Sequence, residues 1–355
     1  MAGDGECPAV LQHLQKRKNR TAHVAVSRIL QWRVRALDAD TGAVFVEALV
    51  DCGRAPIPAH ECVVGPHVNA ATGGWLAEDG AGQAVAQSKR PVDNQPFIVV
   101  LLERLLGFAP GDKVVCSTGW QRYSMHAASA LQKIPAEVDA IHYLGPLGVN
   151  GLTAYFGLLK VGQPEAGETV MVSAAAGSVG HLVGQIAKIR GCQVIGIAGQ
   201  DNKCNLLVDQ LGFDAAVNYK QGDYRSALKD ATPNGVDVYF DNTGGFVLGS
   251  ALFRLNVNGR IVCCGVVSQY DTDAPEPGPK GIPGLLVNKR IRMQGFLVFD
   301  YLALYAAARK EISGWLDSGQ LTSRVDEVQG LESAPAAFVD LLAGGNVGTR
   351  VVLVE

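Results

Sequence analysis

The sequence predicts an α/β fold in which helices cover a doubly wound parallel sheet, and three observations carry this prediction. Apolar runs of strand length alternate with helical patterns from Glu168 onward. The first of these runs is followed by a turn of small residues and then by a helix. The chain has 355 residues, of which 48% are hydrophobic, and this is enough for two domains with cores of their own.

Composition and charge argue against two classes of partner. The net charge is -3 and 18% of the residues are charged, so nothing favours nucleic acid or an anionic membrane. No apolar run approaches the length of a membrane span, and the first ten residues lack the features of a secretory signal. Eight scattered cysteines without a CxxC pair indicate reduced thiols. We therefore expect a cytoplasmic protein.

The turn of small residues follows the apolar run Val170–Val172 and precedes apolar residues at helical spacing. Ala175, Gly177 and Gly180 have the spacing of a dinucleotide-binding fingerprint, with alanine at the first glycine position. Small residues let the backbone approach a pyrophosphate, and the N-terminus of the helix supplies free N–H groups. The alternative interpretation is a tight strand-to-helix turn that binds nothing.

The other elements are predicted from the same periodicities, taken in chain order. Residues 1–106 are the least readable: we expect a solvated basic helix near 16–20, strands within 24–37 and 44–50, and no assigned function for 65–93. Further strands are expected at 113–116, 192–198, 215–219, 236–241, 260–266, 291–298 and 349–354. Helices are expected at 151–159, 201–211, 223–231, 246–255 and 301–318, with a short one after Pro335. The proline-rich segment 271–284 is expected to be a loop inserted in the sheet domain, as a lid or a partner contact.

A metal site is not expected. His60–Glu61, eight residues after Cys52, is similar to the His-Glu pair that binds zinc in zinc alcohol dehydrogenases. A catalytic zinc needs three protein ligands and an open position, and the sequence offers no third ligand and no four-cysteine cluster. We interpret His60 as a residue of a surface loop.

The end of the second sheet strand predicts the choice of cofactor. Folds that select NAD carry an acidic residue there, bonded to the ribose hydroxyls, but this chain has Gly199. Asp201 directly precedes a helical run, so we interpret it as a helix cap rather than as the ribose acid. Lys203 is placed to neutralise a 2′-phosphate, which favours NADPH over NADH. The alternative for Lys203 is a solvated lysine on the helix face.

Several segments, in this order, closely resemble one enzyme family: GLTAYFGLL, VSAAAGSVG, VGQIAK, LGFDAAVNYK, YFDNTGG, GRIVCCGVVSQY and NVGTRVV. From about residue 107 to 355 the chain resembles the zinc-independent medium-chain dehydrogenase/reductases of the leukotriene hydroxydehydrogenase, prostaglandin reductase and curcumin reductase group, which includes alkenal double-bond reductases. The resemblance implies a Rossmann domain at 144–318, inserted in a mostly-β GroES-like substrate domain made of 1–143 and 319–355. It also implies a homodimer.

The resemblance further implies NADPH-dependent reduction of the carbon–carbon double bond of an α,β-unsaturated aldehyde or ketone. A quinone reductase and a non-catalytic NADPH-binding protein remain as alternatives. The cofactor-binding residues that it implies are Ala176, Gly177, Ser178, Val179, Gly180, Lys203, Tyr219, Asn242, Cys264, Gly265, Val266, Ser268, Tyr270, Phe296, Leu297, Val298 and Asn346. Tyr270 is the candidate catalytic donor to the substrate carbonyl. The local alternatives are a strand-end aromatic for Tyr219, turn residues for Asn242 and Asn346, and a loop aromatic for Tyr270.

Residues 1–106 depart from the family. Its members carry an Asp-Pro-Tyr-Met-Arg-Gly-Arg-like segment near the substrate, and this chain has no such segment there. A divergent substrate domain is one explanation. A displaced reading frame in the source gene is another, and translating the other frames across this region tests it.

Overall fold

The computed structural model describes residues 107–354, except Pro110, Asp271 and 275–277, together with four short strands near the N-terminus. These strands are β1 (Trp32–Leu37), β2 (Ala43–Ala48), β3 (Ala77–Glu78) and β4 (Ala84–Val85). The strands predicted within 24–37 and 44–50 coincide in part with β1 and β2. The other interpretations of residues 1–106, including those of Cys52 and His60–Glu61, lie outside the described residues.

The chain divides into two compact units. One comprises residues 141–328 and 332–352 and contains the parallel sheet. The other comprises, among the described residues, the four short strands with 107–140, 329–331 and 353–354. The domain boundaries given above, 144–318 and 319–355, remain a proposal.

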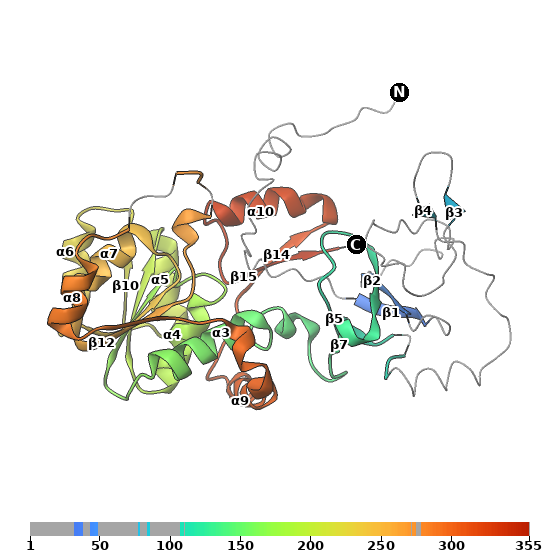
Figure 1. Cartoon of the computed structure of the whole chain (residues 1–355), viewed down its shortest axis with the longest axis horizontal. Coiled ribbons are helices and arrows are strands. Elements are labelled where there is room, and N and C mark those ends of the chain that lie inside the picture. The colour runs from blue at the N-terminus through green and yellow to red at the C-terminus, as the bar shows by residue number, and fades with distance from the viewer. Residues whose placement is uncertain are drawn as a thin grey trace, which may run out of the picture. The chain divides into compact units, whose positions relative to one another are not determined.

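Six parallel strands form the sheet of the first unit, in the order β10-β9-β8-β11-β12-β13 (Figure 1). The chain moves outward from β8 to β10, returns beside β8 as β11, and moves outward again to β13. This reversal is the doubly wound topology predicted from the alternating pattern. The strands are β8 (Thr169–Ser173), β9 (Gln193–Ala198), β10 (Ala215–Asn218), β11 (Val236–Asp241), β12 (Leu255–Cys263) and β13 (Arg292–Gly295).

Helices connect the successive strands of the sheet, and their ends follow from local sequence signals. Gly212 ends one helix with a φ of 71°, a left-handed conformation that glycine adopts at no steric cost. Asp223 caps another, since its carboxylate accepts hydrogen bonds from the N–H groups of Arg225 and Ser226. The helices are α3 (Val149–Phe156), α4 (Gly180–Ile189), α5 (Asp201–Leu211), α6 (Tyr224–Ala231), α7 (Gly245–Arg254), α8 (Ile282–Lys289) and α9 (Tyr305–Asp317). Helices α4 to α8 connect the successive strands, α3 precedes β8 and α9 follows β13.

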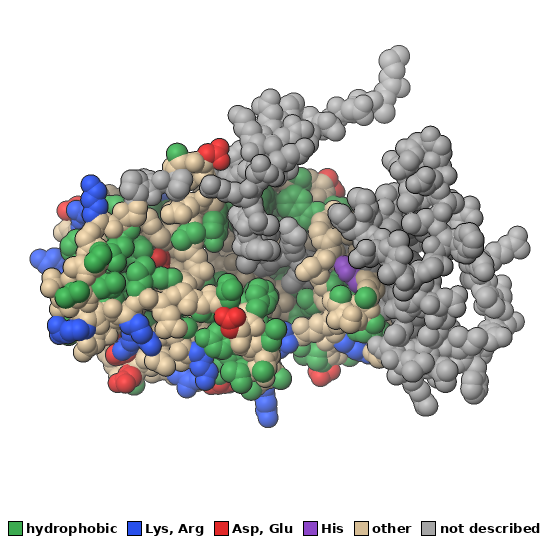
Figure 2. All heavy atoms as spheres, viewed as in Figure 1, with side chains coloured by type: hydrophobic (Ala, Val, Ile, Leu, Met, Phe, Trp, Pro, Cys, Tyr) green, Lys and Arg blue, Asp and Glu red, His purple; other side chains and the backbone are tan. Residues whose placement is uncertain are grey.

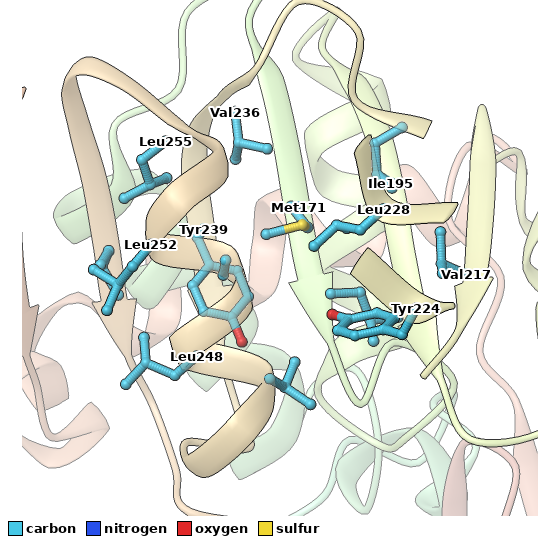
Figure 3. Packing of buried hydrophobic residues seen from close by; sticks show 14 of the residues in the cluster. Met171, Ile195, Val217, Tyr224, Leu228, Val236, Tyr239, Leu248, Leu252 and Leu255 are labelled. Atoms are coloured by element: carbon cyan, nitrogen blue, oxygen red, sulfur yellow. The ribbon is translucent and has the colours of Figure 1, made fainter. Parts of the chain in front are cut away.

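A hydrophobic core lies between the sheet and the helices α6 and α7. Figure 3 shows Met171 and Tyr239 of the sheet facing Leu228 and Leu248 of these helices. Every residue of β8 is buried, because helices cover both faces of a doubly wound sheet. This explains why the strands read as unbroken apolar runs rather than as alternating ones.

Three predicted elements are corrected by the structure. The strand predicted at 260–266 ends at Cys263, because the N–H of Gly265 donates to the same Asp241 carbonyl as the N–H of Cys264 instead of continuing the ladder. The strand predicted at 291–298 ends at Gly295, and Val298 begins a 3-10 helix (Val298–Leu304). The loop predicted at 271–284 ends in α8, whose Pro283 lies in the first turn, where no N–H is needed.

The second unit contains a five-stranded sheet in the order β6-β2-β1-β5-β7, and its neighbouring strands are antiparallel. The later strands are β5 (Lys113–Val115), β6 (Tyr123–Ala127) and β7 (Gln132–Lys133). Phe108, Val114, Cys116 and Val354 form a small core there. The C-terminal segment, most of which belongs to the first unit, contains β14 (Val325–Gln329), α10 (Ala334–Leu342) and β15 (Thr349–Leu353), with β14 beside β15. In the described part of the chain, no helix is long and apolar enough to cross a membrane.

Candidate functional site

The glycine turn between β8 and α4 has the tight geometry that the fingerprint predicts. A Cβ atom on Gly180 would lie 2.3 Å from the Ala174 oxygen and 2.8 Å from the Ala175 Cα, so only glycine allows the helix this close to the strand. Ala174 itself has a φ of 46°, a conformation that costs an ordinary residue about 1 kcal/mol or more. Gly177 is less constrained, since its Cβ would meet only the Ala174 oxygen, at 3.2 Å.

The C-terminal segment lies against this turn. The N–H of Gly348 donates to the Ala176 oxygen at 2.8 Å, and Gly177 and Gly348 form an isolated parallel bridge. Asn346, two residues earlier, donates through Nδ2 to the Gly348 oxygen at 2.9 Å. The structure therefore brings the predicted residues Ala176, Gly177 and Asn346 together, although they are far apart in the sequence.

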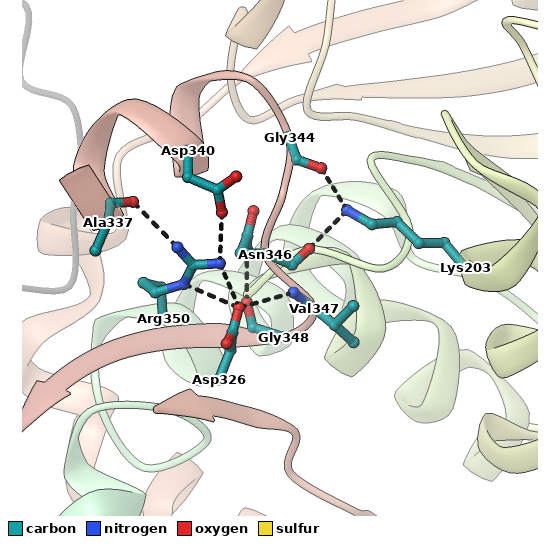
Figure 4. Close-up of polar contacts among 9 residues, drawn as sticks. All are labelled: Lys203, Asp326, Ala337, Asp340, Gly344, Asn346, Val347, Gly348 and Arg350. Atoms are coloured by element: carbon teal, nitrogen blue, oxygen red, sulfur yellow. Dashed lines mark hydrogen bonds and ion pairs between the residues drawn. The ribbon is translucent and has the colours of Figure 1, made fainter. Parts of the chain in front are cut away.

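Lys203 of α5 points toward the same segment (Figure 4). Its Nζ donates to the Gly344 oxygen at 2.7 Å and to the Asn346 oxygen at 2.6 Å, and only 8% of the residue is exposed. Burial lowers the pKa of Lys203, while the nearby carboxylates of Asp340 and Asp326 act in the opposite direction. The alternative of a solvated lysine is therefore wrong, because the ammonium group is buried against backbone carbonyls.

Asp201 is not the helix cap that the sequence predicts. Gln200 occupies the N-cap position without a side-chain cap bond, and Asp201 is the first residue of α5. The Asp201 carboxylate instead accepts from the side-chain amides of Asn218 and Gln221, each at 2.7 Å. Asn218 is the last residue of β10 and Gln221 follows it, so the Asp201 carboxylate is bound by residues of the neighbouring strand end and caps no N–H group of its own helix. The N–H of Lys203 is capped by the side chain of Asn202.

Tyr219 covers the position where an NAD-selective acid would stand. A Cβ atom on Gly199 would lie 3.1 Å from the Tyr219 ring and 3.2 Å from Cε of Lys220. The ammonium group of Lys220 lies 5.8 Å from the centre of that ring, and its charge also lowers the pKa of Lys203. A tyrosine and a lysine therefore stand beside Gly199 at the ends of β9 and β10.

Asn242 lies where the strand order reverses, between β8 and β11. Its Nδ2 donates to the Ser173 oxygen at 2.8 Å and its N–H to the Ser173 hydroxyl at 2.9 Å. The neighbouring Asp241 is 2% exposed, and its Oδ1 accepts from Tyr239 Oη and from the N–H groups of Thr243 and Gly244. Ligands of open α/β sheets bind at such reversal points.

The segment from Cys264 to Tyr270 follows β12 and folds over Asn242. The N–H of Val267 donates to the Asn242 oxygen at 3.1 Å, and a Cβ on Gly265 would lie 3.2 Å from that oxygen. Ser268 donates through its hydroxyl to the Thr243 oxygen. The Tyr270 hydroxyl lies over this turn, where it accepts from the Val266 N–H at 3.5 Å.

The three residues predicted beside the nicotinamide follow β13 and differ in exposure. The Phe296 ring packs where a Cβ of Gly157 would stand, Leu297 is 65% exposed and Val298 is buried. The predicted cofactor-binding residues from 176 to 298 thus all follow the carboxyl ends of the strands or begin the helices there. The structure places them along one edge of the sheet, as the topology requires.

The sequence analysis did not identify two residues of this region, Lys220 and His181. Lys220 carries a weak signal, because it is a second basic residue directly after Tyr219. His181 carries none, because the residues next to it in α4 are glycine and apolar residues and one of its two polar partners, Arg324, lies in a distant part of the chain. Among the described residues, no group of three or more His, Cys, Asp or Glu side chains could hold a metal ion.

Comparison with known proteins agrees with this geometry. Residues 178–313 match a family model described as zinc-binding dehydrogenase. The chain is 45% identical over 253 residues to the NADP-dependent 2-alkenal reductase of Nicotiana tabacum, covering 70% of this chain and 73% of the relative. It is 40% identical over 252 residues to the NADPH-dependent curcumin reductase of Escherichia coli, with the same coverage. The chain belongs to the zinc-independent medium-chain dehydrogenase/reductases.

The family membership establishes the class of enzyme and the cofactor. The crystal structure of CurA from Vibrio vulnificus in complex with NADPH superposes with a TM-score of 0.67 at 41% identity, covering 70% of this chain and 75% of that one. The present chain is therefore an NADP-dependent oxidoreductase, and its cofactor is NADPH. The described residues fit NADPH, because Gly199 stands where an NAD-selective fold has its ribose acid and the Lys220 ammonium group lies beside Tyr219.

Proposed function

We propose that the protein reduces the carbon–carbon double bond of α,β-unsaturated aldehydes and ketones with NADPH. Relatives of at least 40% identity named 2-alkenal, curcumin and prostaglandin reductases support this, and so does (+)-pulegone reductase of Mentha piperita at 44%. The observation that carries the proposal is that these relatives match about 70% of the chain at 40% identity or more.

The chemistry asked of the chain's own residues is binding, orientation and charge stabilisation. Bound NADPH supplies a hydride for the β-carbon of the substrate. Gly177 to Gly180 hold the pyrophosphate, and Asn242 with the segment 264–270 lines the cofactor. Negative charge then develops on the substrate carbonyl oxygen, and a preplaced hydrogen-bond donor stabilises it. We assign that donor to the Tyr270 hydroxyl.

The decisive experiment measures NADPH consumption with enals, enones and quinones, with the products identified. Saturation of the double bond in an enal or enone is the expected result. Activity confined to quinones would assign the protein as a quinone reductase. NADPH binding without turnover on the whole panel would leave it a non-catalytic binding protein.

Lys203→Ala should weaken NADPH binding about tenfold to a hundredfold, because a charge-assisted contact to the 2′-phosphate is worth about 1.5–3 kcal/mol. NADH binding should change little, since NADH lacks that phosphate. Titration of both cofactors against both proteins measures this. Equal losses for NADPH and NADH would show that Lys203 acts only by holding the Gly344 and Asn346 carbonyls.

Tyr270→Phe should lower kcat roughly tenfold to a hundredfold with an enone. Removing a preplaced oxyanion donor costs about 2.7–4 kcal/mol in well-studied enzymes, and a neutral phenol should be worth somewhat less. The dissociation constant of NADPH should stay unchanged, because the ring remains in place. Turnover of the variant at the wild-type rate would place the donor elsewhere.

We also propose a homodimer that forms along β13, the edge strand of the sheet. An edge strand presents unpaired N–H and C=O groups. Figure 2 shows hydrophobic side chains gathered over α7 and α8, where Phe253 and Val287 are exposed.

Light scattering should give twice the 37.5 kDa of the chain. Val287→Glu places a charge on the proposed α8 surface and should yield a monomer. The control Val208→Glu changes a residue of α5 and should leave the dimer intact. A monomeric wild-type protein would refute the proposal.

The proposed location is the cytoplasm. The five cysteines in the described part of the chain are all free, and the reducing conditions there keep thiols in that state.

A further inference from the structure

A buried histidine connects the phosphate turn to the C-terminal segment. His181 is the second residue of α4 and is 1% exposed. Its Nδ1 lies 2.8 Å from the Gly177 oxygen, and its Nε2 lies 3.2 Å from the backbone nitrogen of Arg324. The two partners belong to elements far apart in the sequence, and both contacts are made by one ring.

The partners determine the tautomer of His181. The Gly177 carbonyl oxygen can only accept, so Nδ1 carries the proton and donates. The Arg324 N–H can only donate, so Nε2 presents its lone pair. Burial lowers the pKa of His181 to about 4, so the ring is neutral at neutral pH and keeps this single arrangement.

The contact to Gly177 has a consequence for the neighbouring N–H group. The Gly177 oxygen accepts from the imidazole and also from the His181 backbone N–H at 3.2 Å, so it points along α4. The carbonyl of Gly177 and the N–H of Ser178 belong to one planar trans peptide and point in opposite directions. Fixing the oxygen therefore directs the Ser178 N–H outward from the helix N-terminus, where an anion binds.

The contact to Arg324 ties the same ring to the C-terminal segment. The Arg324 oxygen accepts from the Thr349 N–H at 2.8 Å, next to Gly348, whose N–H donates to the Ala176 oxygen. The hydrogen bonds thus form a closed circuit. It runs from His181 to Arg324, from Arg324 to Thr349, and from Gly348 back to Ala176 in the glycine turn.

We propose that His181 is a positioning residue for the diphosphate of NADPH: its Nδ1–H fixes the peptide between Gly177 and Ser178, so that the Ser178 N–H is aimed at the diphosphate. The contact to Arg324 orients the ring for this task. The inference rests on the proposed pyrophosphate site at residues 177–180. It adds a side chain that is neither in the fingerprint nor in contact with the cofactor.

Three substitutions separate the two contacts of the ring. His181→Asn keeps an N–H donor near the position of Nδ1 and is too short to reach Arg324. His181→Gln places its amide near the position of Nε2 and gives up the donor beside Gly177. His181→Phe keeps the volume and loses both contacts. The measurements are the dissociation constant of NADPH, the KM of NADPH and kcat with an enone at saturating cofactor.

The expected result is that His181→Asn binds NADPH within about threefold of wild type, while His181→Gln and His181→Phe bind about tenfold more weakly. In the Gln and Phe variants the KM of NADPH should rise while kcat stays unchanged. Three results would each overturn the proposal. The Asn and Phe variants could lose NADPH affinity equally, the Asn variant could lose affinity while the Gln variant does not, or all three could bind NADPH as wild type does. If the Phe variant does not fold, a tenfold loss in the Asn variant or wild-type affinity in the Gln variant still overturns the proposal.

Gln185 provides the matched control. One turn along α4, its amide donates to the Thr322 oxygen at 3.0 Å and to the His181 backbone oxygen at 2.8 Å and accepts from the Thr322 N–H at 2.8 Å, and it makes no hydrogen bond to Gly177. Gln185→Met should speed hydrogen exchange at 322–324 and leave NADPH affinity within about threefold. A tenfold loss in this control would show that docking of the segment, rather than the peptide at Gly177, sets the affinity.

Hydrogen exchange of the wild-type protein separates this inference from the proposed site. NADPH should protect the amides of residues 174–180. If it does not, the pyrophosphate site itself is misplaced, whatever the His181 variants show. If protection is seen, the variants test His181 alone.

Discussion

Gly180→Ala should lower the free energy of unfolding by about 3 kcal/mol and weaken NADPH binding. The added methyl group would stand 2.3 Å from the Ala174 oxygen and 2.8 Å from the Ala175 Cα. These are backbone atoms of a turn that is buried against the sheet, so they cannot rotate away as a side chain would. Overpacking of this kind costs about 1–3 kcal/mol, and an unyielding neighbour places the cost at the upper end.

Two matched glycine substitutions control for this result. Gly314 lies in α9 with open space around its Cβ position, so Gly314→Ala should be neutral or stabilise by up to about 1 kcal/mol. Gly177→Ala should cost little stability, because its Cβ meets a single atom at 3.2 Å, yet it should weaken NADPH binding by obstructing the pyrophosphate. Thermal unfolding and NADPH titration of the three variants measure both effects. A Gly180→Ala protein as stable as wild type would show that α4 can move away from β8.

Asp241→Ala should be the most destabilising single change at the end of the sheet, at about 4 kcal/mol. Oδ1 accepts from the Tyr239 hydroxyl at 2.8 Å, from Thr243 N at 3.0 Å, from Gly244 N at 2.9 Å and from the Ser173 hydroxyl at 3.3 Å. The residue is 2% exposed, so its removal leaves these donors without an acceptor. Each buried donor left unsatisfied costs about 1–3 kcal/mol, and partial relaxation keeps the total below their sum.

The same change should also reduce NADPH affinity, because the turn that it organises holds Asn242 against Ser173. Asp241→Asn keeps an oxygen acceptor and should cost less than half as much stability. Asp230→Ala, at an exposed position of α6, should stay within about 0.5 kcal/mol of wild type. Chemical denaturation measures all three. A loss below about 1 kcal/mol for Asp241→Ala would mean that water replaces the carboxylate.

Sequence reasoning predicted elements well where the determining signal is local. β11 matches its predicted bounds at Val236–Asp241, as does α5 at Asp201–Leu211, because an apolar run or a periodic face with a following glycine is complete within one segment. It failed at strand ends. Cys264 and Gly265 continue the apolar run of β12, but the Gly265 N–H shares the Asp241 carbonyl with the Cys264 N–H, and there the ladder ends.

The sequence by itself determined the doubly wound sheet, the glycine turn between β8 and α4 and the absence of an acid at position 199, since each depends on the order of residues within a few positions. Only the tertiary structure decided what surrounds them. Lys203 meets carbonyls that are 141 and 143 residues away, and His181 meets Arg324 at a separation of 143. Periodicity within one helix shows which residues are buried, but the partner of a buried polar group depends on which distant segment packs against it.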